Sequence, residues 1–203
     1  MLLNKNNRNK NKLTFVIITG CAGSGKTFIG MSIAKKLKWT YIDKDTVTRD
    51  FTDWILEDKG KSKGDRESVL YCESIRPIEY STTFKVCKEN LEIGNSVVLT
   101  IPFIAQIQDY QKWIDLAKES GIDMEHICLK FIWIKHDIGR EYTRVKIRNA
   151  KRDENKLENW ELYRESVEGI EPDEKYAAYI FENDTNSIDE SYLEDVIEWI
   201  RKY

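Results

Sequence analysis

Residues 14–27, with the sequence TFVIITGCAGSGKT, decide the fold of this 203-residue chain. The apolar run Thr14–Thr19 predicts a buried strand. Residues 20–27 match the pattern GxxxxGK[ST], and the apolar spacing of residues 28–37 predicts an amphipathic helix directly after it. A strand, a glycine-rich loop and a helix in this order predict a phosphate-binding loop. Backbone N–H groups of the loop and the N-terminus of the helix then face the same anion.

The loop predicts a nucleotide site with ATP and Mg²⁺ as cofactors. Lys26 is expected to reach the β- and γ-phosphates and to act in catalysis, and Thr27 is expected to bind Mg²⁺. The glycines allow the backbone to turn its N–H groups toward phosphate oxygens. The predicted nucleotide-binding residues of the loop are Gly20, Ala22, Gly23, Ser24, Gly25, Lys26, Thr27 and Phe28.

Apolar runs alternate with helical patterns along the rest of the chain. Continuous apolar strands are typical of a parallel sheet that is covered on both faces. We therefore predict a three-layer α/β/α fold with a five-stranded parallel sheet, formed by residues 13–203 as a single domain after a flexible tail of residues 1–12. The predicted strands are Thr14–Thr19, Thr40–Ile42, Ser96–Ile101, Ile127–Ile134 and Ala178–Phe181, and the predicted helices are Gly25–Leu37, Thr46–Glu57, Arg66–Glu92, Ile107–Ser120, Ile138–Ala150, Glu154–Val167 and Ser191–Lys202.

Composition excludes several classes of protein. Lys and Arg number 32 against 35 Asp and Glu, a net charge of −3, which disfavours a general nucleic-acid-binding surface. The four cysteines are too far apart for a CxxC metal or redox site. No apolar run has the length of a membrane span or of a signal peptide, so we expect a cytoplasmic protein without a membrane partner. The oligomeric state has no signature in the sequence.

The second predicted strand is followed by two carboxylates, Asp43 and Asp45. Ligands bind beyond the carboxyl ends of such strands, and a carboxylate there can accept the proton of an acceptor hydroxyl. We favour Asp45 as this base, with a cap of the helix beginning at Thr46 as its alternative role. Asp43 could instead be the base, an outer-sphere Mg²⁺ ligand or a turn residue. The chain has no NKxD motif of a GTPase and no acidic residue closing the third strand, as a motor would have.

A basic island follows the fourth predicted strand. Residues 135–156 contain eight Lys and Arg against four Asp and Glu, and five of the basic residues recur every fourth position from Arg140 to Lys156. A helix broken near residues 149–152 would let several of them converge on phosphate oxygens. We predict a lid over residues 136–168, in which Arg144 and Arg148 contact the nucleotide and Arg148 and Arg152 act in catalysis. The alternative is a solvated helix with ion pairs between successive turns.

The segment of residues 58–92 is expected to bind the acceptor above the strand ends. Arg76 and Tyr80 are four residues apart and face the same side of the predicted helix, while Arg66 lies near its start. Pro102 ends the third strand over the same cleft. We predict that these four residues, together with Asp43 and Asp45, bind the acceptor. An exposed, ion-paired helix with a kink at Pro77 is the alternative.

The loop, the Asp after the second strand and the Arg-rich lid together resemble the small P-loop kinases. Relatives of this type include chloramphenicol phosphotransferases, gluconate and shikimate kinases, zeta-type toxins and polynucleotide 5′-kinases. The stretch Asp43–Thr46 is similar to the zeta-toxin segment that holds the catalytic Asp, which implies that Asp45 is the base and Arg49 a substrate contact. Further stretches, among them Asp65–Ser68 and Arg76–Tyr80, resemble a group of bacterial ATP-binding proteins known as AAA-family or kinase-like, for which we know no acceptor.

The predicted function is transfer of the γ-phosphate of ATP to a hydroxyl of a small polar molecule. One alternative is a kinase of nucleic-acid 5′-hydroxyls or of sugar nucleotides, although the net charge disfavours nucleic acid as the partner. Another is an ATP-binding regulatory module without transfer activity. The sequence does not name the acceptor.

Overall fold

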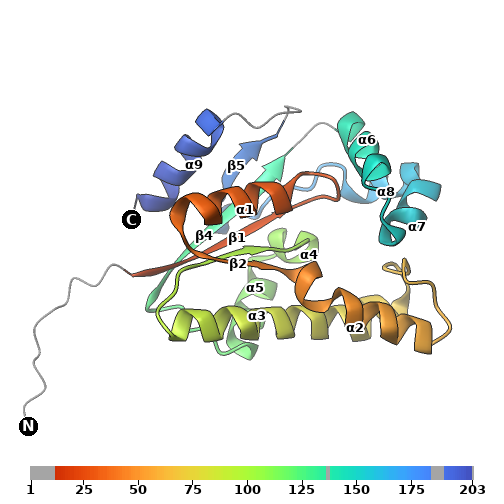
Figure 1. Cartoon of the computed structure of the whole chain (residues 1–203), viewed down its shortest axis with the longest axis horizontal. Helices are drawn as coiled ribbons and strands as arrows, with labels where there is room; N and C mark the ends of the chain where they lie inside the picture. Colours follow the sequence, from red (N-terminus) through yellow and green to blue (C-terminus); the bar gives the residue numbers. More distant parts are fainter. Residues whose placement is uncertain (1–11, 136–137, 184–189, 203) are drawn as a thin grey trace, which may run out of the picture.

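Five parallel strands form a single sheet in the order β2-β3-β1-β4-β5 (Figure 1). The computed structural model describes residues 12–135, 138–183 and 190–202, so the predicted tail of residues 1–12 lies outside the described residues apart from Lys12. The strands are β1 Leu13–Gly20, β2 Thr40–Asp43, β3 Val97–Thr100, β4 Ile127–Lys135 and β5 Tyr179–Glu182. The predicted α/β class and the five-stranded parallel sheet are confirmed.

Helices cover both faces of this sheet, as its apolar strands require. Along β1, Phe15 and Ile17 pack into one hydrophobic core and Val16 and Ile18 into the other, because successive side chains of a strand point to opposite faces. The first core lies under α3 and α5, and the second lies under α1 and α9 (Figure 1). The covering helices are α1 Lys26–Leu37, α3 Arg76–Glu92, α4 Ile104–Ile107, α5 Tyr110–Glu119 and α9 Glu190–Arg201.

A second group of helices lies beyond the sheet, near the carboxyl ends of the strands (Figure 1). This group contains α2 Lys44–Asp58, the π-helical turn η1 Leu70–Ile75 and the predicted lid, which consists of α6 Ile138–Arg148, the 3₁₀ turn η2 Lys151–Asp153, α7 Glu154–Glu158 and α8 Trp160–Val167. The lid thus has the predicted break after its first helix, and its second helix is divided in two. A further 3₁₀ turn, η3 Glu174–Tyr176, packs against the first core through Tyr176. Across the three described ranges, no helix is both long and apolar enough to cross a membrane.

Three of the predicted helices are divided or shortened in the structure, near Pro77, Asp109 and Asn159. The expected helix of residues 66–92 begins only near residue 69, and a π-helical turn precedes α3, whose first turn contains Pro77. Proline has no N–H to donate, so a regular α-helix cannot run through this position without losing a hydrogen bond. Asp109 caps α5 and separates it from α4, and Asn159 leaves helical geometry between α7 and α8.

Helix α1 lies unusually close to the sheet at Gly30. A Cβ atom at this position would overlap Thr100 Cγ2 of β3 and lie 3.0 Å from Tyr41 Cε2 of β2. The absence of a side chain therefore allows α1 to approach the carboxyl ends of both strands. This approach brings Thr27, at the start of α1, next to Asp43, at the end of β2.

Candidate active site

The phosphate-binding loop joins β1 to α1 in a conformation that its glycines permit. Gly23 and Gly25 have φ angles of 79° and 93°, in the left-handed region that other residues disfavour. A Cβ atom on Gly25 would also lie 2.6 Å from Nδ2 of Asn183, which donates to the carbonyl of Ser24 at 2.7 Å. The loop is thus held between the start of α1 and the end of β5.

Lys26 folds back over this loop. Its ammonium group donates to the carbonyls of Gly20 at 2.8 Å and Cys21 at 2.7 Å. Burial lowers the pKa of Lys26 from 10.5 to about 8. The ammonium also donates to the hydroxyl of Ser24 at 3.4 Å. An ammonium whose hydrogen-bond partners are all neutral favours an incoming phosphate, so the residues present fit the predicted nucleotide.

Thr27 and Asp43 form the pair that fits Mg²⁺. The hydroxyl of Thr27 donates to Oδ2 of Asp43 at 3.2 Å, and Thr100 donates to the same oxygen at 2.7 Å. The residues described by the structure contain no cluster of three His, Cys, Asp or Glu side chains that could bind a metal alone. Mg²⁺ in nucleotide sites commonly has only one or two protein ligands, and phosphate oxygens and water complete its coordination. The hydroxyl of Thr27 and the carboxylate of Asp43 are therefore sufficient as the protein's share of such a site.

Asp43 also caps helix α2, which corrects the predicted start of that helix. Oδ1 of Asp43 accepts from the backbone N–H of Thr46 at 3.0 Å, and α2 begins at Lys44 rather than at Thr46. The helix is therefore capped by Asp43 and not by Asp45, for which capping was the alternative role. Asp45 lies in the first turn of α2, where its side chain is available for other contacts.

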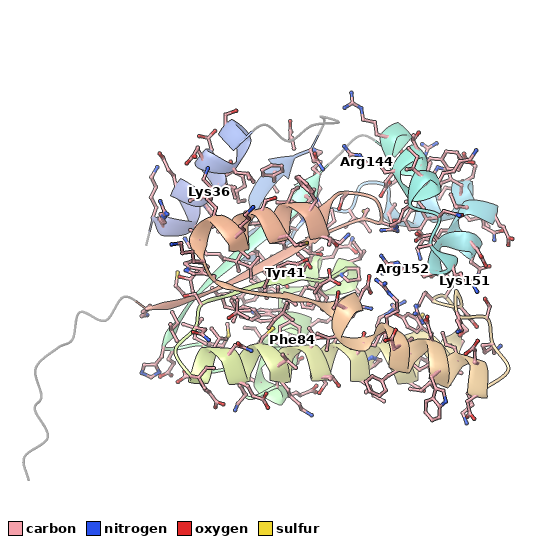
Figure 2. The ribbon with its side chains drawn as sticks, viewed as in Figure 1. Lys36, Tyr41, Phe84, Arg144, Lys151 and Arg152 are labelled. Carbon is pink, nitrogen blue, oxygen red and sulfur yellow. The ribbon has the colours of Figure 1, made fainter. Side chains whose placement is uncertain are left out.

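Asp45 joins the acceptor side of the site to the lid. Oδ1 of Asp45 lies 2.9 Å from the ammonium of Lys44, and Oδ2 accepts from the guanidinium of Arg152. Figure 2 shows Arg152 reaching from the lid toward the N-terminal turn of α2. Burial would raise the pKa of Asp45, but Lys44 and Arg152 outweigh it and hold this pKa well below its usual range.

The helix of the lid breaks between Arg148 and Arg152, as predicted. Helix α6 ends at Arg148, Asn149 adopts a left-handed φ of 46°, and η2 begins at Lys151. The break brings Arg152 to Asp45 across 107 positions of sequence. Arg148 instead makes a bidentate pair with the buried Asp153, at 2.9 and 2.8 Å, and Arg144 donates to the carbonyl of Asn183 at 3.5 Å. His136, the first residue of the predicted lid, lies outside the described residues.

Tyr163 of α8 is a contact to the phosphate-binding loop that the sequence did not reveal. Its hydroxyl accepts from the backbone N–H of Ala22 at 2.9 Å. Burial first, and the charge of Glu141 second, raise the pKa of Tyr163 far above its ordinary value, so the hydroxyl stays protonated. A residue of the lid therefore accepts a hydrogen bond from one of the loop N–H groups that are predicted to bind phosphate.

The predicted acceptor residues are divided between two places. Arg66 and Arg76 lie over the ring of Tyr71, at 5.1 and 5.0 Å from its centroid, and Arg66 pairs with Asp53 at 2.8 Å. Tyr80 is buried and donates to the carbonyl of Pro102 at 2.6 Å. Arg49 and Phe28 are exposed, on α2 and α1. These contacts place the arginine pair next to Tyr71 and near Asp53 of α2, and Tyr80 against Pro102, two residues after the end of β3.

The lid also contacts the loop that follows α2. Lys156 of α7 pairs with Glu67 at 3.3 Å. A Cβ atom at Gly64 would lie 2.6 Å from the carbonyl of Lys151, so the loop after α2 packs directly against η2. The lid and the predicted acceptor segment are therefore in contact in this structure.

A family described as AAA domain matches residues 15–170, which is most of the chain. The chain belongs to this AAA domain family. The match begins in β1 and ends after α8, so it contains the phosphate-binding loop, Asp43, Asp45 and the lid of this AAA domain. No curated protein matches the sequence.

Solved structures of small kinases share the fold of this AAA domain. A protein assigned to the kinases from Chloroflexus aurantiacus has 20% identity and a TM-score of 0.66, covering 95% of this chain and 98% of its own. A sugar kinase from a Janibacter species has 16% identity and a TM-score of 0.58, covering 93% and 95%. The shikimate kinase of Bacteroides thetaiotaomicron has 18% identity and a TM-score of 0.56, covering 93% and 98%. Identities this low establish the P-loop fold and leave the acceptor open.

Proposed function

We propose that this protein is a kinase that transfers the γ-phosphate of ATP to a hydroxyl group of a small polar molecule. The observation that carries the proposal is the placement of Asp45. It lies two residues beyond Asp43, which contacts Thr27 of the phosphate-binding loop at 3.2 Å, and it faces a lid arginine. A carboxylate beside the phosphate site and under a cationic lid is what transfer to a hydroxyl requires.

The phosphate-binding loop would hold the nucleotide. Its backbone N–H groups and the N-terminus of α1 favour anionic oxygens, and Lys26 adds a positive charge close to the carbonyls of Gly20 and Cys21. Thr27 and Asp43 would hold Mg²⁺, which would offset charge on the phosphates when bound. The protein's part here is to orient the phosphates with donors already in position.

Asp45 would orient the acceptor hydroxyl and take its proton. The positive charges around it keep it ionised at neutral pH, so it is ready to accept a hydrogen bond. Its low basicity means that it acts first by orienting the hydroxyl, and the proton moves late, as the oxygen loses its electrons to phosphorus. For this, Arg152 must release Oδ2 of Asp45. The released guanidinium would then be available to the oxygens of the transferring phosphate.

The lid would exclude water from the transferred phosphate. Lid helices contact the loop through Tyr163, α2 through Arg152 and the acceptor segment through Lys156. Closure over a site of this kind prevents hydrolysis of ATP. The similarity in fold to sugar and shikimate kinases supports a small hydroxylated acceptor.

Transfer of label from γ-³²P-ATP tests the proposal. The protein, with Mg²⁺, is incubated with separate pools of sugars and polyols, hydroxy acids, sugar nucleotides, antibiotics and 5′-hydroxyl oligonucleotides. We expect label in one small-molecule pool, and its loss in both Asp45→Asn and Lys26→Ala. Asp50→Asn, an exposed position on α2, is the matched control and keeps the activity. ATP binding without label in any pool would favour the regulatory module, and label in the oligonucleotides would favour the nucleic-acid kinase.

A further inference from the structure

Lys44 is a buried lysine that lies between two carboxylates. Its ammonium is 2.9 Å from Oδ1 of Asp45 and 2.9 Å from Oε2 of Glu79, and its side chain is 4% exposed. Burial would lower the pKa of Lys44, but the two carboxylates outweigh burial and raise it. Lys44 is therefore charged, and it links the first turn of α2 to helix α3.

Glu79 is a fixed anchor for that lysine. Its side chain is 3% exposed and accepts four hydrogen bonds, two on each carboxylate oxygen. Oε1 accepts from Thr48 at 3.2 Å and Thr52 at 2.6 Å, while Oε2 accepts from Lys44 and from Tyr71 at 2.8 Å. With its acceptor sites so occupied, this buried carboxylate has one orientation, and it holds Lys44 in one orientation as well.

The two oxygens of Asp45 have different surroundings as a result. Oδ1 meets Lys44, on the buried side of α2, and Oδ2 meets Arg152, which comes from the lid. Only the partner of Oδ2 can leave by a movement of the lid. We propose that Lys44 and Glu79 are positioning residues for phosphoryl transfer, which aim Oδ2 of Asp45 at the acceptor hydroxyl. This inference rests on the proposed function.

The charges that face Asp45 decide how the inference can be tested. Lys44 and Arg49 lie on its own helix, Arg152 comes from η2, and Lys26 from the loop adds a more distant positive charge. Removing Lys44 leaves Arg152 on Oδ2 but frees Oδ1, so the carboxylate can rotate.

The ¹³C chemical shift of the Asp45 carboxyl group, measured at one fixed neutral pH, reports on this contact without any transfer reaction. The carboxyl signal is assigned by its loss in Asp45→Asn. In the wild type we expect one narrow signal from a carboxylate held in one orientation. In Lys44→Met and in Glu79→Gln we expect this signal to shift or broaden, because Oδ1 of Asp45 loses its fixed partner. Lys130→Met is the matched control, because Lys130 is also buried but lies on β4 and donates to the carbonyl of Lys202.

Turnover of γ-³²P-ATP in the presence of the pooled hydroxyl compounds measures the effect on transfer. Lys44→Met is expected to lower kcat by about 10- to 100-fold with little change in KM for ATP, since small misplacements of a reacting group have effects of this size. The double variant Lys44→Met/Asp45→Asn should be no slower than Asp45→Asn alone. Lys44→Arg, which keeps the charge, should recover part of the rate. If Lys44→Met does not fold, kcat and KM of Lys44→Arg and Glu79→Gln are compared with those of the wild type in its place.

These experiments distinguish a failure of the proposed function from a failure of the positioning role of Lys44 and Glu79. Equal turnover by Asp45→Asn and the wild type would overturn the proposed function, whatever the NMR shows. A large loss in Asp45→Asn, with Lys44→Met and Glu79→Gln at the wild-type rate and with an unmoved Asp45 signal, would overturn the positioning role alone. Additive losses in the double variant would also overturn it.

Discussion

The hydroxyl of Tyr163 accepts a hydrogen bond from the backbone N–H of Ala22, 2.9 Å away and 141 positions earlier in the sequence. Ala22 is the third residue of the phosphate-binding loop, and Tyr163 lies on a lid helix. The ring of Tyr163 contacts Trp160, which in turn contacts Tyr142 of α6, so the hydroxyl is held by an aromatic row. The lid and a phosphate would therefore compete for the same amide.

Replacing Tyr163 with Phe should strengthen ATP binding. The substitution removes the competing hydroxyl and keeps the ring in the aromatic row. Because a hydrogen bond contributes about 0.5–1.5 kcal/mol net, the Kd for MgATP should fall by about 2- to 10-fold. Titration calorimetry measures the change, with Tyr142→Phe as the control from the same row. Weaker binding by Tyr163→Phe would mean that the hydroxyl contacts the nucleotide instead.

Lys26 should make ATP binding sensitive to pH above about 8. Its pKa is lowered to about 8 by burial, so the nucleotide-free protein loses this proton at a lower pH than an unfolded chain does. Bound phosphates favour the charged form, and binding at pH 9 should therefore take up nearly one proton. Calorimetry in buffers of different ionisation enthalpy measures the uptake. Lys26→Arg stays charged and should take up none; a wild type that behaves like this variant would contradict the assignment.

The lowered pKa of Lys26 also makes the free energy of unfolding depend on pH. Between pH 8 and 10.5 the unfolded chain binds more protons at Lys26 than the folded protein does. The contribution of Lys26 to the free energy of unfolding therefore rises with pH across this window and is level below it. ATP should remove this rise by restoring the proton.

Asp43→Asn should separate the roles of the two carboxylates. If Asp43 supports Mg²⁺ with Thr27, the variant should need at least about tenfold more Mg²⁺ for half-maximal turnover, since loss of one metal-site partner has effects of this order. Binding of ATP in the absence of Mg²⁺ should change little. A magnesium titration of turnover gives the result, with Asp50→Asn as control. An unchanged magnesium requirement with a kcat as low as that of Asp45→Asn would make Asp43 the base.

Gly30→Ala should destabilise the protein, and Thr100→Ser should partly restore it. The added methyl group would overlap Thr100 Cγ2, with a predicted loss of about 1–3 kcal/mol in the free energy of unfolding. Serine lacks that methyl but keeps the hydroxyl that donates to Asp43. Urea unfolding of the single and double variants measures the coupling. Independent, additive effects would show that α1 does not approach β3 this closely.

Local sequence was sufficient for the phosphate-binding loop, the five strands and the break after Arg148. Each of these depends on residues close together in the chain: an apolar run, a glycine pattern, or a stop in a helical pattern. Helix ends were less certain. The start of α2 depends on which of two nearby aspartates reaches the N–H of Thr46, and a sequence with Asp43 and Asp45 permits either.

The contacts across the site could not be predicted in the same way. In the sequence, Lys44 lies between two aspartates, and this pattern indicates only a charged residue of a polar turn. Its buried partner Glu79 is 35 positions away, so no local pattern predicts their contact. Glu79, which lies in the predicted acceptor segment, is buried and accepts four hydrogen bonds. Tyr163 shows no local signal, since its partner is a backbone N–H in the loop. Pairings of this kind arise only when the chain has folded.

The measurement that tests the central claim most directly is ³¹P NMR of ATP, Mg²⁺ and the pooled small hydroxyl compounds during incubation with the protein. The account predicts that a phosphomonoester signal grows as the γ-phosphate signal declines, and that Asp45→Asn abolishes this growth while ATP binding persists. Release of inorganic phosphate alone, or ester formation at the wild-type rate in Asp45→Asn, would contradict it.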